Sequence, residues 1–310
     1  MDGLTGLLDG VRARGAFVLR LSLDPPWAMD VRDRAPLTVL CQTRGAAVIV
    51  PETGDPVRLE AGDTAIARGV RSYVFADAPS TAPQVVIHPG QRCTTLDGTD
   101  LRFEMSVGVR TWGNSASGSH RALIGVYEGR SAVGALLLES LPELLVLRRN
   151  DWDTTLVELL ADEAGQDRTG QEAVLDRLLD LVLVGALRAW FDRDPRAPRW
   201  WRASRDEVVG PAIALMHQHP GQRWTVANLA AAVGCSRAAF ARRFTEAVGS
   251  PPMQFLSIWR LTLAADLLVS TRRTISDIAG EVGYSTPFAF SAAFKRLHDV
   301  SPNAYRRAVE

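Results

Sequence analysis

Two stretches of the chain, 49 to 50 residues apart, carry nearly the same phrase, and they constrain the fold more than any other feature. The first is TVANLAAAVGCSRAAFARRF, residues 225–244, and the second is TISDIAGEVGYSTPFAFSAAF, residues 274–294. In each, a threonine precedes apolar residues at helical spacing, a glycine ends that helix, and a hydroxyl residue begins a second helix. The phrase therefore predicts two helices around a tight glycine turn, and the chain contains it twice.

The first copy predicts the details of its two helices. Thr225 can cap a helix whose apolar positions recur every three or four residues, and Gly234 can end that helix in a left-handed conformation. Ser236 can then cap the second helix, which places Phe240 and Phe244 on one face. The arginines of this helix lie off that face, at Arg237, Arg242 and Arg243.

The second copy repeats these features with small changes. Thr274 and Asp277 have the spacing of a capping box, and Gly283 ends the helix that they begin. The next helix begins at Thr286 and Pro287, because proline is well tolerated at the first helical position. Its phenylalanines, at the places of the first pair, are Phe290 and Phe294.

Alanine-rich first helices and an arginine-rich second helix are what a DNA-binding helix-turn-helix requires. The second helix presents its outer face to the major groove, and phosphates are bound by Arg, Lys, hydroxyls or helix N-termini. A single copy is explained equally well as an ordinary helical hairpin, because short motifs often match by chance. Two copies in one region favour a duplicated helix-turn-helix.

The net charge of the whole chain is zero, but its two parts differ. Residues 1–198 hold 21 lysines and arginines against 27 aspartates and glutamates, whereas residues 199–310 hold 14 against 8. The basic C-terminal third fits a domain that meets phosphate, and a solvated basic face is the alternative. Because the sequence shows neither a membrane-spanning apolar run nor a basic leader, we expect a soluble, cytoplasmic protein.

A long helix is predicted between the two copies, in PPMQFLSIWRLTLAADLLVST, residues 251–271. Its apolar stripe can hold the two units in one rigid relation, and SPNAYR follows the second copy. Together with LAAAVGCSRAAFARRF and IAGEVGYSTPFAFSAAFKR, these segments resemble the DNA-binding domain of the AraC/XylS family of transcription regulators. The stripe consists of Phe255, Trp259, Leu263 and Leu267.

The resemblance implies which residues face DNA. Pro287, Phe288 and Ala292 cannot form paired hydrogen bonds with base edges, so we expect the second unit to read thymine methyl groups, DNA shape or phosphate. The implied DNA-binding residues are Ser236, Arg237, Ala238, Ala241, Arg242 and Arg243 in the first unit, and Thr286, Pro287, Phe288, Ser291 and Lys295 in the second.

Residues 15–105 show short apolar segments separated by Gly and Pro, a pattern typical of strands. The predicted strands lie in GAFVLRLSL, PLTVLCQTRGAAVIV, PVRLEAGDTAIAR, SYVFAD and PQVVIHP. The phrase PVRLEAGDTAIARGVRSYVF resembles the Gly-Asp turn of cupin-like β-barrels, which AraC-type regulators often carry before their DNA-binding domain. The implied fold is α+β in two domains, a cupin-like barrel with helices followed by an all-α double helix-turn-helix.

The same resemblance raises an alternative, a ligand-binding cupin or cupin enzyme with a helical accessory domain. Cupin enzymes hold a metal with several histidines and a carboxylate, but Arg71 and Ser72 stand where a histidine often follows the turn. His88 and His120 are isolated, whereas a metal site needs three or four convergent ligands. We therefore expect no metal, no cofactor and no catalytic residue.

From Ser131 the apolar period becomes helical and predicts helices in residues 131–147, 153–164 and 169–191. A Thr169/Glu172 capping box is expected to open the third. This helix is apolar on most sides, so it is buried either within its own domain or against a second copy of the chain.

Three scattered cysteines exclude a disulfide framework and a Cys-x-x-Cys zinc site. Some AraC-type regulators with a similar N-terminal domain are thiol switches, and Cys93, in a polar segment beside Arg92, is the candidate for a low-pKa sensor. Cys41 is its conceivable resolving partner. The alternative is that both are unreactive small apolar residues.

These observations predict a DNA-binding transcription regulator. Residues 1–192 are expected to sense a signal and to dimerise, residues 193–204 to form a linker, and residues 205–310 to bind DNA. The expected partners are double-stranded DNA, RNA polymerase, a small-molecule effector and a second copy of the chain.

Overall fold

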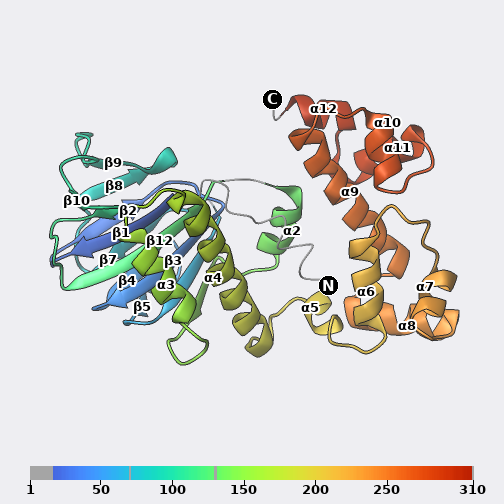
Figure 1. Ribbon diagram of the computed structural model, residues 1–310, viewed down its shortest axis with the longest axis horizontal. Helices are drawn as coiled ribbons and strands as arrows, with labels where there is room; N and C mark the ends of the chain where they lie inside the picture. Colours follow the sequence, from blue (N-terminus) through green and yellow to red (C-terminus); the bar gives the residue numbers. More distant parts are fainter. Residues whose placement is uncertain (1–16, 70, 129–130, 309–310) are drawn as a thin grey trace. The chain divides into compact units, whose positions relative to one another are not determined.

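The computed structural model describes residues 17–69, 71–128 and 131–308, which fall into two compact units. A β-rich unit holds the described residues up to 128 together with residues 141–194. A helical unit holds residues 195–308 and also takes residues 131–140, which lie within the N-terminal part of the sequence (Figure 1). In the described part of the chain, no helix is long and apolar enough to cross a membrane.

The strands of the β-rich unit form two sheets, in which most neighbours pair antiparallel. The first sheet has the order β10 (Ser106–Gly108), β11 (Thr111–Trp112), β1 (Phe17–Leu23), β12 (His120–Tyr127), β3 (Leu37–Arg44), β6 (Thr64–Arg68) and β13 (Leu144–Leu147). The second has the order β5 (Val57–Leu59), β4 (Ala47–Pro51), β7 (Tyr73–Ala76), β2 (Ala28–Val31), β8 (Val85–His88) and β9 (Arg92–Thr95).

The main core of this unit lies between the two sheets. Leu21 and Leu40 of the first sheet belong to one buried cluster with Met29, Ile49 and Phe75 of the second. The strands predicted from the sequence are present, and the domain has the β-rich cupin-like character that the resemblance implied. The described strands make two sheets that pack face to face and do not join into one closed sheet.

Two helices cover the face of the first sheet that points away from this core. They are α3 (Thr155–Ala164), which contacts β1, and α4 (Gln171–Arg193), which packs against α3 and β13. A Cβ atom at Gly125 of β12 would lie 2.3 Å from Leu179 Cδ1 of α4. A glycine is therefore needed there for α4 to approach the sheet.

Two expectations for this region are wrong. α4 begins after Gly170, which has a φ of 80°, and no side chain caps it, so Thr169 and Glu172 do not form a capping box. Residues 131–147 are not one helix but α2 (Ala132–Glu139) followed by strand β13. Pro142 disfavours a continuing helix, and Leu144–Leu147 pair antiparallel with β6 instead.

The apolar stripe of α4 is mostly buried by the chain itself. Its buried apolar residues are Leu175, Leu179, Val182, Leu183, Ala186, Leu187, Trp190 and Phe191. Val174 and Leu181 remain 44% and 49% exposed, and Leu159 of the neighbouring α3 is 51% exposed. Packing within the chain thus accounts for most of the stripe and leaves these three apolar side chains partly exposed.

The helical unit is organised around α9 (Pro252–Ser270), which runs between two clusters of helices (Figure 1). One buried cluster contains Phe240 and Phe244, and the other contains Phe290 and Phe294. The remaining helices are α5 (Arg199–Ala203), α6 (Val209–Gln218), α7 (Val226–Ala232), α8 (Arg237–Val248), α10 (Ile275–Glu281), α11 (Pro287–His298) and α12 (Pro302–Arg307).

The buried face of α9 differs from the predicted stripe. Leu256 packs in the first cluster, whereas Leu261, Ala265 and Leu268 pack in the second. The helix therefore changes its buried face halfway along, because it serves two cores in succession. Of the predicted stripe, Trp259 is buried and the other three residues, Phe255, Leu263 and Leu267, are only partly buried.

Helix α2 is fastened to α9 inside the helical unit. The backbone amides of Ala132 and Val133 donate to the two carboxylate oxygens of Asp266, at 2.5 and 3.1 Å. Val133 and Trp259 are buried together, and Leu136 packs beside them. A carboxylate at a helix N-terminus is favoured by the helix dipole.

Candidate DNA-binding surface

The first helix-turn-helix has the caps that its sequence predicts. Thr225 Oγ1 accepts from Asn228 N at 3.1 Å, and Asn228 Oδ1 accepts from Thr225 N at 2.7 Å, which completes a capping box before α7. Gly234 has a φ of 68° in the turn. Ser236 then caps α8 by accepting from Ala239 N at 3.3 Å.

The second helix-turn-helix repeats this arrangement. Thr274 and Asp277 form a capping box before α10, and Gly283 has a φ of 86°. Thr286 caps α11 by accepting from Ala289 N at 3.1 Å, and Pro287 occupies the first helical position. The predicted caps and glycine turns of both copies are confirmed.

The two turns share the same backbone hydrogen bond. Cys235 N donates to Ala230 O at 2.8 Å in the first unit, and Tyr284 N donates to Ala279 O at 2.8 Å in the second. The donor and the acceptor in the second unit each lie 49 residues after their counterparts in the first. The repeated phrase therefore forms the same turn twice.

The second turn is also fastened to the loop that precedes the first unit. Arg260 of α9 donates through Nε to Pro220 O at 2.7 Å and through Nη2 to Gln222 O at 2.6 Å. A Cβ atom at Gly283 would lie 2.7 Å from Arg260 Nη2 and 2.9 Å from Gly221 O. These contacts join the two units directly, in addition to the shared helix.

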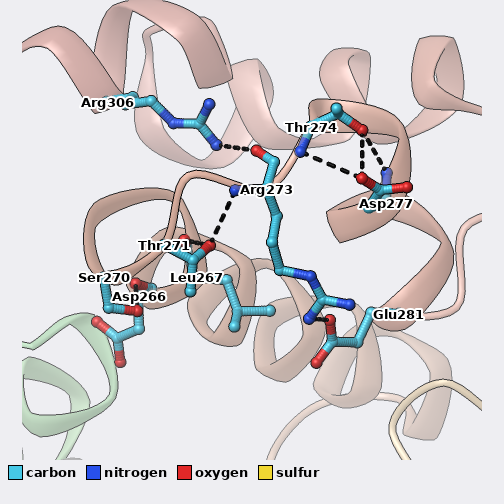
Figure 2. Close-up of polar contacts among 9 residues, drawn as sticks. All are labelled: Asp266, Leu267, Ser270, Thr271, Arg273, Thr274, Asp277, Glu281 and Arg306. Atoms are coloured by element: carbon cyan, nitrogen blue, oxygen red, sulfur yellow. Dashed lines mark hydrogen bonds and ion pairs between the residues drawn. The ribbon is translucent and has the colours of Figure 1, made fainter.

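The loop between α9 and α10 is held by a network of polar contacts (Figure 2). Thr271 Oγ1 donates to Leu267 O at 2.7 Å, and Arg306 Nη2 donates to Arg273 O at 2.6 Å. The Arg273 side chain forms an ion pair with Glu281. In Figure 2, the Asp266 side chain points toward the green ribbon of α2. The second unit thus begins from a fixed position relative to α9.

The buried and outward faces of both second helices follow the sequence expectation. Phe240, Phe244, Phe290 and Phe294 are fully buried. Phe288, on the outward side of α11, is 85% exposed. The other residues expected to face DNA are exposed, at Ser236, Arg237, Ala238, Arg242, Arg243, Thr286, Pro287, Ala292 and Lys295, or partly exposed, at Ala241 and Ser291.

The three arginines of α8 have different surroundings. Arg243 Nε donates to Asp206 Oδ2 at 3.0 Å, so its guanidinium is engaged within the chain. Arg242 Nε lies 4.0 Å from Glu246 Oε1, and both side chains are mostly exposed. Such a distant, exposed pair contributes little, which leaves the Arg242 guanidinium available. Among the described residues, Arg237 has no ion-pair partner.

Sequence reasoning overlooked Arg296. It is exposed and follows Lys295 in the last turn of α11. The sequence shows the Lys-Arg pair, but the family resemblance implies a DNA contact only for Lys295. Its exposed cationic side chain is of the kind that contacts phosphate.

The surroundings of Cys93 do not favour a low pKa for its thiol. Cys93 lies in strand β9 and not in a polar loop, and it is only partly exposed. Burial, followed by the nearby charge of Asp100, raises the pKa of its thiol to about 11. Burial also raises the pKa of Cys41 to about 12. Both thiols are therefore protonated at neutral pH, and thiolate chemistry is disfavoured.

The two histidines considered as ligands have other neighbours. His88 Nε2 lies 2.9 Å from Thr94 Oγ1, and the His120 ring lies 6.0 Å from that of Trp27. In the part of the chain that the structure describes, no three His, Cys, Asp or Glu residues are placed to hold a metal.

Comparison with known proteins agrees with both compact units, the β-rich one and the helical one. A family model described as Cupin matches residues 2–192, and one described as Helix-turn-helix domain matches residues 229–308. A protein of Streptomyces lividans named AraC-like transcription regulator is 30% identical, over 99% of this chain and 98% of its own. The chain belongs to the AraC family of transcription regulators. The resemblance found in the sequence is thereby confirmed, and this AraC-family protein is a DNA-binding transcription regulator.

Other relatives of this AraC-family regulator have the same description. The transcriptional regulator AlkR of Acinetobacter baylyi is 26% identical over 99% of each chain. Among solved structures, the DNA-binding domain of AdpA in complex with a target DNA is 34% identical. This match covers 33% of the present chain and 92% of the AdpA chain, with a TM-score of 0.32.

Proposed function

We propose that α8 is the principal sequence reader of this regulator and that α11 adds apolar, shape and phosphate contacts. The difference between the two outward faces carries the proposal. Arg237 and Arg242 of α8 are exposed and can form paired hydrogen bonds with guanine O6 and N7. At the corresponding end of α11, Pro287 and Phe288 offer no side-chain donor.

Phe288 is the feature of α11 that most needs a partner. A phenylalanine ring that is 85% exposed gains free energy when a bound surface covers it. Thymine presents a methyl group in the major groove, which an apolar side chain can contact. Phe288 therefore supports a role for α11 in apolar readout, with Lys295 and Arg296 close to phosphate.

The fastening of the two units supports a fixed spacing between the two DNA contacts. Helix α9 serves both cores, and Arg260 joins the loop before α7 to the second turn. Two recognition helices in a rigid relation can enter successive major grooves, about 34 Å or about 10 bp apart. One chain should then cover two patches on one face of the duplex.

Selection of bound duplexes from a random library tests this assignment. The wild-type protein should select two short motifs about 10 bp apart. The double variant Arg237→Ala, Arg242→Ala should lose one motif and keep the other, and Phe288→Ala should weaken the motif that the double variant keeps. If the double variant selects both motifs unchanged, the assignment of α8 as the sequence reader is wrong.

We also propose that the regulator is a homodimer held by its N-terminal domain. Val174 and Leu181 of α4 and Leu159 of α3 are large apolar residues that remain exposed. Pairing with a second copy would cover them. Sedimentation should show a dimer at micromolar concentration, and Leu181→Arg should shift it toward a monomer. A wild-type monomer with and without DNA would contradict the proposal.

The β-rich unit is proposed to sense a small effector rather than to catalyse a reaction. Its support is the family, since the relatives that match nearly full length are transcription regulators. Regulation of transcription further implies RNA polymerase as a partner and the cytoplasm as the place of action. In vitro transcription from a bound promoter tests the polymerase step: adding the regulator should change the transcript level, and an unchanged level would contradict it.

A further inference from the structure

The β-rich unit contains a cavity of about 620 Å³ on the helix-covered side of its first sheet. Strands β1, β3 and β12, the Gly62–Asp63 turn and helix α3 form its walls. Strand pairing shows which face this is, because Arg20 pairs with Leu123, Leu123 with Cys41, and Cys41 with Thr64. This row alternates with Leu21 and the other residues that pack between the sheets, so it points the opposite way.

The space between the two sheets is almost filled. The cavity there is about 60 Å³, and its lining is mainly apolar, with Leu21, Met29 and Phe75 among its walls. Pockets that enclose small ligands measure about 300–1,000 Å³, so this space is too small for a metabolite. A cavity of about 620 Å³ is in the range that encloses small ligands.

Four arginines line the larger cavity. They are Arg20, Arg44, Arg121 and Arg149, and among the described residues none of their side chains has an ion-pair partner. Arg20 and Arg121 are partly buried, and Arg121 Nε is fully buried without a hydrogen-bond partner. The Arg121 guanidinium therefore has donors that an acceptor on a ligand can use.

Helix α3 and the turn fix where these arginines lie. A Cβ atom at Gly165 would lie 2.1 Å from Arg20 Nη1, so the Arg20 guanidinium sits against the C-terminal end of α3. A Cβ atom at Gly62 would lie 2.7 Å from the Arg149 side chain, so Arg149 lies over the turn. Two glycines thus leave room for two of the arginine side chains.

The carboxylates of the cavity do not balance this charge. Asp63 is taken, because its carboxylate accepts from Arg148 Nη1 at 2.7 Å and from Arg149 N at 3.0 Å. Glu158 and Asp162 are exposed residues of α3. Two partly buried arginines, Arg20 and Arg121, and two exposed ones therefore line the cavity with two exposed carboxylates, which leaves an excess of positive charge along its walls.

We propose that this cavity binds the effector and that the effector is a small organic anion with a carboxylate or phosphate group. Guanidinium groups bind both groups through paired, charge-assisted hydrogen bonds. The buried side chains of Leu123 and Val157 provide apolar wall for the rest of the molecule. The identification as an effector rests on the proposed sensing function, whereas the binding site itself rests on the cavity.

The cavity is connected through α3 to the helix that precedes the DNA-binding domain in the sequence. Helix α3 forms one wall of the cavity and packs against α4. Helix α4 ends at Arg193, directly before the segment that leads to the helical unit. A ligand that changes the position of α3 therefore acts on the helix that precedes the connection.

Calorimetric titration of the full-length protein tests the site with stated probes: inorganic phosphate, succinate and benzoate, the last two compared with succinamide and benzamide. At least one anion should bind, and a carboxylate should bind about tenfold or more tightly than its neutral amide if the site selects carboxylates. Binding of phosphate alone identifies a phosphate site. The absence of binding by all three anions overturns the proposal.

Matched variants localise the binding. Arg20→Gln, Arg121→Gln should raise the Kd of the bound anion about tenfold or more, whereas Arg188→Gln, an exposed arginine of α4 outside the cavity, should change it less than twofold. Without ligand, the double variant should melt no lower than the wild type, because it loses two uncompensated charges. An unchanged Kd in the folded double variant overturns the site.

DNA binding measured on the same samples separates the site from the function. If the anion binds and its addition changes DNA affinity, both the site and its role as effector site are supported. Intact DNA binding without any anion binding removes the site and leaves the regulator function standing. Anion binding that leaves DNA affinity unchanged removes the effector role and keeps the cavity as a binding site.

Discussion

The two helix-turn-helix units of this AraC-family regulator agree where they are buried and differ where they are exposed. In each, two phenylalanines four residues apart are fully buried, and a glycine with positive φ forms the turn. The outward faces differ, since Arg242 of α8 is exposed and charged whereas Phe288 of α11 is exposed and apolar. Packing thus requires the residues that the two copies share, whereas the exposed residues of the two second helices differ.

The largest expected effects test the shared interior. Phe244→Ala and Phe294→Ala should each lower the free energy of unfolding by about 3–5 kcal/mol, because each removes a fully buried ring. Urea denaturation measures both. Phe288→Ala is the control and should change stability by less than about 0.5 kcal/mol, because that ring is 85% exposed. Equal losses for Phe288 and Phe294 would contradict the buried and outward faces assigned to α11.

Alanine substitutions of the two turn glycines, Gly234 and Gly283, should have unequal effects on stability. Both have positive φ, so alanine costs about 1–2 kcal/mol at either position. At Gly283 the new Cβ also meets Arg260 Nη2 and Gly221 O, whereas at Gly234 no atom beyond the adjacent residues lies within 4 Å. Overpacking adds about 1–3 kcal/mol, so Gly283→Ala should be clearly the more destabilising in urea denaturation. Equal costs would mean that the contact between the units is absent.

Arg242 should distinguish the two units in DNA binding. Arg242→Ala should weaken binding by about 1–3 kcal/mol at its cognate base and relax the preference there, because it removes a paired contact to a base edge. Affinities for a panel of single-base operator variants measure this. A uniform loss at every base pair would show that Arg242 contacts phosphate and that α8 is not the reader.

Lys295 should behave in the opposite way. It is exposed in the last turn of α11 and is expected to contact phosphate. Lys295→Ala should weaken all operator variants alike and should reduce the slope of log affinity against log salt by about 0.9. Arg242→Ala, measured in parallel, is the comparison for specificity. A base-specific change in Lys295→Ala would move this residue into the group that reads sequence.

The helical unit could be predicted because its features depend on residues close together in the sequence. The cavity could not, because it depends on strands that pair over long distances in the sequence. The caps at Thr225 and Thr274 depend on residues within one helical turn, so spacing alone indicated them. Strand β13 was mistaken for helix because LLVL is apolar throughout and shows no period of two. Its partner β6 lies far away in the chain, and only their pairing reveals the strand.

The candidate effector site shows the same limit. Arg20 and Arg121 are about one hundred residues apart in the sequence. They lie on one face of neighbouring strands because β1 and β12 pair antiparallel, with Arg20 opposite Leu123 and Ser22 opposite Arg121. Neither arginine stands in a motif. For Cys93, the neighbouring Arg92 suggested a low thiol pKa, whereas burial in β9 raises the pKa.

The smallest expected effect compares the two capping boxes by pH. The first box uses Asn228, which does not titrate, and the second uses Asp277, whose pKa is lowered by hydrogen bonds from the Thr274 side chain and then from its backbone. Because the folded pKa of Asp277 lies below the usual value of about 3.9, the second box stabilises the folded protein above that pH and loses this contribution as pH falls through the folded pKa.

Asp277→Asn should therefore reduce the fall in Tm between about pH 5 and pH 3, and Asn228→Asp should increase this fall. Thermal unfolding of the wild type and both variants across this range measures the difference. Identical pH profiles for wild type and Asp277→Asn would show that the charge of the second box contributes nothing to its stability.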